Sequence, residues 1–169
     1  MDAASWGFIG TLLGAIVGAS ASVLTTTINS RNALRLHKVS NELDRAERSR
    51  AFQRETLLIT QDILQDLMRL MTRSHIADNA AFRQTGQWGR NMLEDELSDA
   101  ILLANRKMSA YVERIVDDTL RNTLKNLHGE ISKINQSESI EQAKNGLLIV
   151  GLSFEAVMMQ FGSALREYY

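Results

Sequence analysis

The sequence predicts an all-α protein in which an N-terminal transmembrane helix continues into a cytoplasmic bundle of three long helices. Residues 6–28 contain no charged side chain, whereas the rest of the 169-residue chain is strongly charged. In that charged part, apolar residues recur at steps of three and four, which is helical spacing. The chain also contains no Pro, the residue that breaks helix interiors, so a few long uninterrupted helices are expected.

Composition limits the function classes. We expect a short extracytoplasmic N-terminus at residues 1–5, the transmembrane helix at 6–28 and one soluble helical domain at 29–169. With 19 Lys and Arg against 20 Asp and Glu, the net charge of −1 gives no general attraction to RNA. The absence of Cys and the presence of only three His leave little material for a metal site, so no metal and no cofactor are expected.

The first element, residues 6–28, has the length of a membrane span. At about 1.5 Å per residue it reaches roughly 35 Å, against a hydrocarbon core of about 30 Å. Small residues follow one another at four-residue steps along it: Gly10, Gly14, Gly18, Ser22 and Thr26. Residues four apart share a helix face, and small side chains let a second helix approach closely in lipid. We therefore expect this stripe to pack against other helices or to line a pore.

Basic residues directly after the span set its orientation. Arg31, Arg35 and Lys38 follow it, so the positive-inside rule places the N-terminus outside and residues 29–169 in the cytoplasm. The same three side chains could contact anionic lipid headgroups. A cleaved signal peptide is the alternative, since residues 19–21 resemble a cleavage site, but no basic residue precedes the apolar run.

The first long helix of the domain is expected at about residues 30–75. Its first half mixes acidic and basic residues as a solvated stalk does, and its second half is apolar enough to join a core. The span and this helix could form one continuous helix. The three-and-four spacing of apolar residues is lost at residues 76–91, where Gly86, Trp88 and Gly89 predict a turn.

The second helix is expected at about residues 92–128. Asn91 is the predicted N-cap, apolar residues recur from Leu97 to Leu127, and Gly129 is the predicted stop. Ser137 or Ser139 should cap the third helix, at about 138–167.

The third helix carries an apolar seam at alternating steps of three and four. Its central members are Leu147, Val150, Phe154, Val157 and Phe161. Flanking positions are apolar as well, so we expect the helix to be deeply buried or shared between subunits. Residues 145–165 could alternatively form a second membrane span, although the carboxylate of Glu155 would then cost about 2.5 kcal/mol or more.

Three residues of the second helix carry the only pattern that suggests catalysis. Arg121, Asn122 and His128 resemble the Arg-polar-His signature of HEPN ribonucleases, a helical family in which Arg and His meet across a dimer to cleave RNA. Arg121 and His128 are seven residues apart and so lie on nearly one helix face. The alternative is structural: His128 near a helix C-terminus, and Arg121 paired with Asp117 or Asp118.

The base rate of such a short motif is high. Arg31 with His37 and Arg69 with His75 fit the same spacing. No phosphate-binding loop, nucleophile elbow or paired-His motif is present. Enzymatic activity is therefore not the first expectation.

The glycine-striped span, the basic segment after it and the RN-x-H type sequence together resemble the small membrane accessory proteins of type VI-B CRISPR systems. That resemblance implies a cytoplasm-facing ring of subunits, a pore through the bacterial inner membrane and an antiphage role beside an RNA-guided nuclease. It does not require Arg121 and His128 to be catalytic.

Three functions are thus expected in order. The first is a homo-oligomeric membrane protein that forms or gates a pore, with the lipid bilayer and other copies of itself as partners. The second is a membrane-tethered HEPN-type ribonuclease. The third is a non-catalytic membrane scaffold that recruits a soluble partner.

Overall fold

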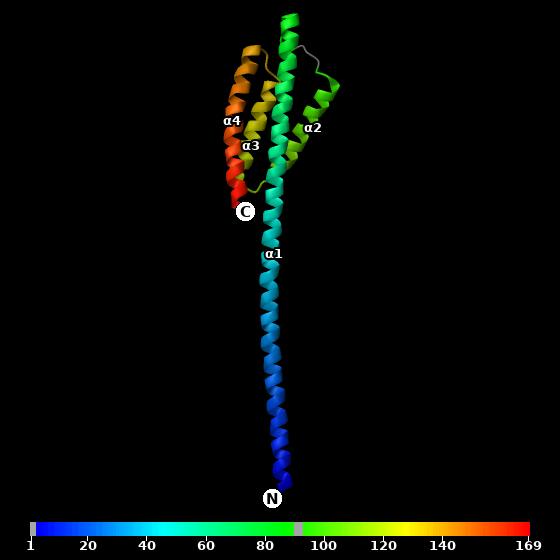
Figure 1. Cartoon of the computed structure of the whole chain (residues 1–169), viewed down its shortest axis with the longest axis vertical. Helices are drawn as coiled ribbons and strands as arrows, with labels where there is room; N and C mark the ends of the chain where they lie inside the picture. Colours follow the sequence, from blue (N-terminus) through cyan, green and yellow to red (C-terminus); the bar gives the residue numbers. More distant parts are fainter. Residues whose placement is uncertain (1–2, 90–92) are drawn as a thin grey trace. The chain divides into compact units, whose positions relative to one another are not determined.

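Four helices and no strand make up the described part of the protein (Figure 1). The structure is a computed structural model that describes residues 3–89 and 93–169, with side chains from residue 10 on apart from residue 12. The helices are α1 (Ala3–Thr85), α2 (Asp95–Val112), α3 (Asp118–Ile134) and α4 (Ile140–Glu167). The all-α prediction is confirmed for these residues. The predicted cap Asn91 lies outside them.

The chain divides into two compact units, Met1–Arg48 and Ser49–Tyr169, called here the first and second unit. In the first unit, every described side chain is exposed. The chain crosses from one unit to the other within α1, whose backbone shows no break between Ala3 and Thr85. By length and composition, two described helices could cross a membrane: α1 near the N-terminus, and α4.

The predicted helix at 92–128 is wrong, because a turn at residues 113–117 divides it into α2 and α3. Asp117 starts α3 as its N-cap, and its carboxylate accepts bonds from the backbone N–H of Thr119 at 2.8 Å and of Leu120 at 3.1 Å. Gln53 of α1 supplies bonds to the backbone of the turn itself. The apolar spacing continues across the break because Ile115, inside the turn, is also buried.

Two other boundaries differ from expectation. Gly129 does not stop the helix, since α3 continues to Ile134. Among the described residues, only Gly86 and Gly89 have a positive backbone φ, so Gly129 does not adopt the left-handed conformation of a helix stop. α1 likewise continues to Thr85, so the predicted turn begins at Gly86 rather than near residue 76. These two glycines adopt φ of 70° and 73°, which L side chains rarely tolerate.

Trp88 joins the turn after α1 to the connection between α3 and α4, at the same end of the second unit. Its indole N–H donates to the carbonyl of Ser137, 3.0 Å away in the connection between α3 and α4. The rings of His75 and Phe82 lie 5.8 Å and 6.0 Å from the Trp88 ring. Ser139, one of the two predicted caps, is the N-cap of α4, and its Oγ accepts a hydrogen bond from the N–H of Gln142 at 3.2 Å.

One apolar core joins all four helices of the second unit. Its most completely buried members include Leu64 and Leu67 of α1, Met108 of α2, Leu124 of α3, and Val157 and Phe161 of α4. In the α4 seam, Val150, Val157 and Phe161 are buried, while Leu147 and Phe154 are half-buried against the core. The predicted seam therefore faces the core.

The opposite face of α4 is open to solvent. Leu148, Ile149, Leu152 and Met159 are 67%, 54%, 64% and 71% exposed. The expectation of a helix buried on every side is wrong for a single chain, because α1 and α3 pack against one side of α4 only (Figure 1). The alternative, a helix shared between subunits, stays a prediction.

Candidate functional site

The small-residue stripe of α1 has no neighbour within its own unit. A Cβ added at Gly10, Gly14 or Gly18 would meet no atom within 4 Å. Ser22 and Thr26 continue the stripe and are exposed. The face is therefore free for close contact with a helix from another molecule.

Three hydroxyl groups in the same part of α1 donate to carbonyl groups of their own helix. Thr26 Oγ1 donates to the carbonyl of Ser22, and Thr27 Oγ1 to that of Val23, both at 2.8 Å. Ser20 Oγ donates in the same way to the carbonyl of Ile16. A hydroxyl that bonds its own helix leaves no orphan donor when the helix enters lipid, so these polar residues are compatible with a membrane span.

The bulky apolar side chains that the structure describes in this segment are all exposed. Their exposed fractions lie between 55% and 66% for Leu13, Ile16, Val17, Val23, Leu24 and Ile28. Arg31, Arg35 and Lys38 follow and are exposed too, and no ion pair holds them within the described part of the chain. An apolar segment bordered by free basic residues is the arrangement found at a membrane surface.

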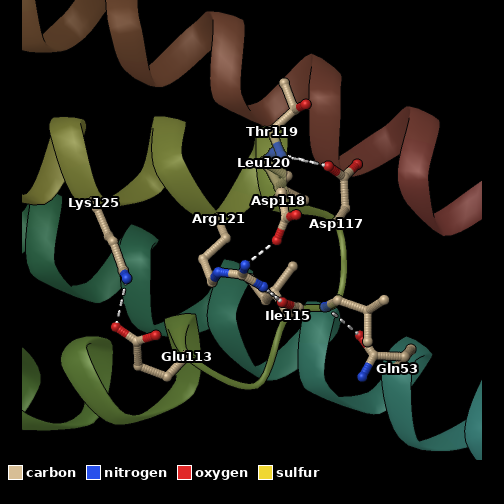
Figure 2. A network of polar contacts seen from close by, with 10 residues as sticks. Gln53, Glu113, Ile115, Asp117, Asp118, Thr119, Leu120, Arg121 and Lys125 are labelled. Atoms are coloured by element: carbon tan, nitrogen blue, oxygen red, sulfur yellow. Dashed lines mark hydrogen bonds and ion pairs between the residues drawn. The ribbon is translucent and has the colours of Figure 1, made fainter.

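Arg121 is held at the start of α3 (Figure 2). Its Nη1 donates to the carbonyl of Ile115 at 2.5 Å, and its Nη2 forms a close ion pair with the carboxylate of Asp118. The predicted pairing with Asp118 is confirmed, whereas Asp117 serves as the N-cap. Arg121 therefore joins α3 to the turn that precedes it.

His128 lies in the middle of α3 and not at a helix end, so the expected role at a helix C-terminus is wrong. Its Nε2 lies 2.7 Å from Oδ1 of Asn105 in α2. Nδ2 of Asn105 donates to the carbonyl of Ile101, which leaves Oδ1 to accept and makes His128 Nε2 the donor. Burial lowers the pKa of His128, which favours the neutral ring. His128 therefore joins α3 to α2, and Asn122 between the two motif residues is exposed.

In another of the Arg–His pairs that match the motif, Arg69 and His75 contact different residues. Arg69 pairs with Asp66 at 3.0 Å, and His75 lies against Trp88. Burial is the main cause that lowers the pKa of His75; Asp78 raises it, and Lys144 lowers it further. In the part of the chain that the structure describes, no three His, Asp or Glu residues are grouped so as to hold a metal ion.

The stability of the second unit should decrease as the pH falls below about 6.5. Since burial lowers the pKa of His75 and His128, the unfolded chain, with an ordinary His pKa near 6.5, binds more protons than the folded chain in this range. Stability therefore rises with pH through the window between the lowered folded-state pKa and about 6.5. Urea titrations at about pH 7.5 and about pH 5 measure the difference.

The matched variants are His128→Gln and His37→Gln. The first should reduce the dependence on pH, because it removes one of the two groups responsible. The second should leave it unchanged, because His37 lies outside the second unit. An equal response of both variants would contradict this assignment.

Gln53 is the structurally important polar residue that spacing arguments missed. It is 5% exposed, its Nε2 donates to the carbonyl of Arg114 at 3.0 Å, and its Oε1 accepts from the N–H of Val116 at 3.1 Å. Figure 2 shows it at the turn between α2 and α3. The available signal was its position, four residues before the core residue Leu57 and so on the buried face of α1.

The fold and these sites define an all-helical protein with an exposed apolar N-terminal helix and a packed helical unit at its C-terminal end. Comparison with known proteins gives no match to any family model, curated protein or solved structure. Function is therefore argued from the geometry of this chain.

Proposed function

We propose that the protein is a single-span membrane protein that assembles as a homo-oligomer and forms or gates a pore. The observation that carries the proposal is the open glycine stripe on an apolar helix, since a Cβ at Gly10, Gly14 or Gly18 would meet nothing. A helix of this kind has two unmet requirements, an apolar environment and a close helical neighbour. A bilayer meets the first, and another copy of the same helix meets the second.

The hydrophobic effect supports the bilayer as the environment of this segment. Each square ångström of apolar surface removed from water contributes about 25 cal/mol, and the large apolar side chains of residues 13–28 are all more than half exposed. Nothing else in the first unit can cover them, because every described side chain there is exposed. The basic residues Arg31, Arg35 and Lys38 then lie at the cytoplasmic surface, with the second unit inside the cell.

The stripe supports the pore. In lipid, helices associate where small residues let their backbones approach, and Gly14 is the middle one of three glycines at four-residue steps. Ser22 and Thr26 extend the same face with hydroxyl groups toward the cytoplasmic end. The resemblance to type VI-B accessory proteins adds an antiphage role at the bacterial inner membrane and an RNA-guided nuclease as partner.

A membrane-tethered ribonuclease is less favoured by the geometry. Arg121 and His128 are both held by partners inside the second unit, Asp118 and Asn105 respectively. Equal loss of an RNA substrate with the wild type and with His128→Ala would exclude a role for this residue in cleavage. A scaffold without conductance is the remaining alternative, and it would give a stoichiometric soluble partner in a pull-down.

Gly14→Leu should weaken assembly in the membrane by about tenfold, which corresponds to about 1.4 kcal/mol. The Leu side chain would separate helices that the glycine stripe allows to approach. Oligomer size in mild detergent, followed by light scattering over a dilution series, measures this effect. Ser20→Leu is the matched control, since it places the same side chain about 120° around the helix from Gly14, away from the stripe, and should leave assembly unchanged.

Depolarisation of cells tests the pore itself. A potential-sensitive dye should report loss of membrane potential when the wild type is expressed and activated, and a smaller loss with Gly14→Leu. A protein that stays monomeric in detergent and never depolarises the membrane would contradict the proposal. Oligomers without depolarisation would favour the scaffold.

A further inference from the structure

The exposed side of α4 is an apolar surface with a single charge near its centre. We call Leu148, Ile149, Leu152, Glu155 and Met159 the α4 outer face. Its four apolar members are each more than half exposed, and Glu155 has no ion-pair partner within the described residues. A contiguous apolar patch of this kind on a helical unit marks an interaction surface.

A groove of complementary character lies between α1 and α2 of the same unit. Its volume is about 340 Å³, and Ile63, Leu70 and Leu103 contribute apolar walls. Arg69, Arg73 and Lys107 add three basic groups along it, against the one carboxylate of Asp66. Arg69 is paired with Asp66, whereas Arg73 and Lys107 have no ion pair in the part of the chain that is described. We call this the α1–α2 groove.

We propose that the α4 outer face of one copy docks into the α1–α2 groove of a second copy. The inference rests on the homo-oligomer of the proposed function and names the cytoplasmic surfaces that build it. An amphipathic helix laid in an apolar groove is a common mode of recognition. Leu148, Leu152 and Met159 supply the apolar contacts, and the lone carboxylate of Glu155 meets Arg73 and Lys107 at the basic rim.

The direction of the helices agrees with this pairing and disfavours an antiparallel pair of α4 with itself. Within the second unit, α4 runs opposite to the Ser49–Thr85 part of α1, because Tyr169 lies over Arg54 and Ser137 contacts Trp88 (Figure 1). The outer face and the groove are different surfaces, so the contact is heterologous and further copies can be added by one rotation. A rotation about an axis along α1 keeps residue 49 of every copy on the same side. An antiparallel α4–α4 pair would place the two copies of residue 49 on opposite sides.

Insertion of α4 into the bilayer is the competing use of this surface. It would place the carboxylate of Glu155 in hydrocarbon, which is costly, and it would remove Val157 and Phe161 from the core that they complete. Docking on a second copy leaves the core intact and gives Glu155 two cationic partners.

Disulfide cross-linking of the full-length protein in native membranes tests the pairing, and the natural absence of Cys gives a clean background. The double variant Leu152→Cys, Leu103→Cys should form cross-linked dimers and longer ladders under a mild oxidant. Leu152→Cys or Leu103→Cys alone should not, because each places a thiol on one half of the interface only. Leu152→Cys with Asn126→Cys is the control, since Asn126 is exposed on α3, outside the groove.

The other outcomes separate a failure of this interface from a failure of the proposed function. Efficient cross-linking of Leu152→Cys alone would mean that α4 packs on α4. Absence of cross-links in an oligomer that persists would mean that the membrane span carries assembly, which leaves the proposed function standing. Cross-links of the expected pattern without depolarisation would retain the interface and contradict the pore.

Charge reversal gives a second, independent measurement of the contact. Glu155→Lys should reduce the yield of Leu152–Leu103 cross-links about tenfold, since it places a cation against Arg73 and Lys107. Adding Arg73→Glu and Lys107→Glu to the Glu155→Lys protein should restore the yield. These positions are not buried, and circular dichroism of each variant checks that the helices remain. An unchanged yield with Glu155→Lys, or no recovery in the combined variant, would contradict the proposal.

Discussion

Phe161→Ala should lower the free energy of unfolding of the second unit by about 3–5 kcal/mol. Phe161 is 0% exposed and belongs to the core shared by all four helices, so truncation removes apolar contact and leaves a cavity. Because the unit then approaches the limit of marginal stability, we also expect lower protein levels in cells. A urea titration of the detergent-solubilised protein, followed by the fluorescence of Trp88 in a Trp6→Phe background, measures the loss.

Met159→Ala is the matched control on the same helix. Met159 is 71% exposed on the α4 outer face, so its truncation should change the free energy of unfolding by less than about 0.5 kcal/mol. The same variant should weaken association between copies, because Met159 belongs to the proposed interface. Similar losses of stability in the two variants would mean that the outer face is already covered inside a single chain.

Gln53→Met should lower the free energy of unfolding by about 1–3 kcal/mol. Methionine has a similar shape but bonds neither the carbonyl of Arg114 nor the N–H of Val116, which Gln53 now satisfies. These two bonds join α1 to the turn between α2 and α3, more than 60 residues along the chain. Hydrogen exchange provides a local readout, since the amide of Val116 should exchange faster while that of Leu124 changes less.

Gln84→Met provides the comparison for this variant. Gln84 lies on the same helix and is exposed, so its replacement should leave both stability and the exchange of Val116 unchanged. If Gln53→Met unfolded at the same urea concentration as the wild type, the turn would be stable without α1. The division of the predicted second helix would then be due to Asp117 and its local bonds alone.

Local sequence signals predicted the helices and caps whose formation depends on residues close together in the chain. The absence of Pro and the three-and-four spacing of apolar residues correspond to the helices observed in the described residues. Ser139 was one of two predicted caps of α4 and accepts the bond that a cap should accept. The spacing also assigned Val150, Val157 and Phe161 to the buried face.

Partners far along the chain produced the elements that local signals missed. The turn at residues 113–117 breaks a continuous apolar period, and Gln53 contributes bonds that no local pattern includes. Gly129 was expected to end a helix, but the residues beyond it place Ile131 and Ile134 in the core, and that burial favours continuing α3. Helix spacing alone could not distinguish the turn inside an apolar run from the helix that continues past Gly129.

The residues of the candidate site could be predicted from the sequence, but their contacts could not. The small-residue stripe was visible in the sequence, and the structure adds that nothing in the first unit covers it. The Arg121 and His128 motif was visible as well, but their partners Ile115, Asp118 and Asn105 could be identified only in three dimensions.

The sequence by itself determined that this protein is all helical, because helix formation depends on residues three and four apart. It also determined that residues 6–28 are apolar enough to span a membrane, since hydropathy is a property of composition. Only the tertiary structure showed that the side of α4 opposite the seam is uncovered, because that helix is apolar nearly all round and its composition predicted burial on every side. For that reason the α4 outer face, with Glu155 among exposed apolar side chains, became visible only in the fold.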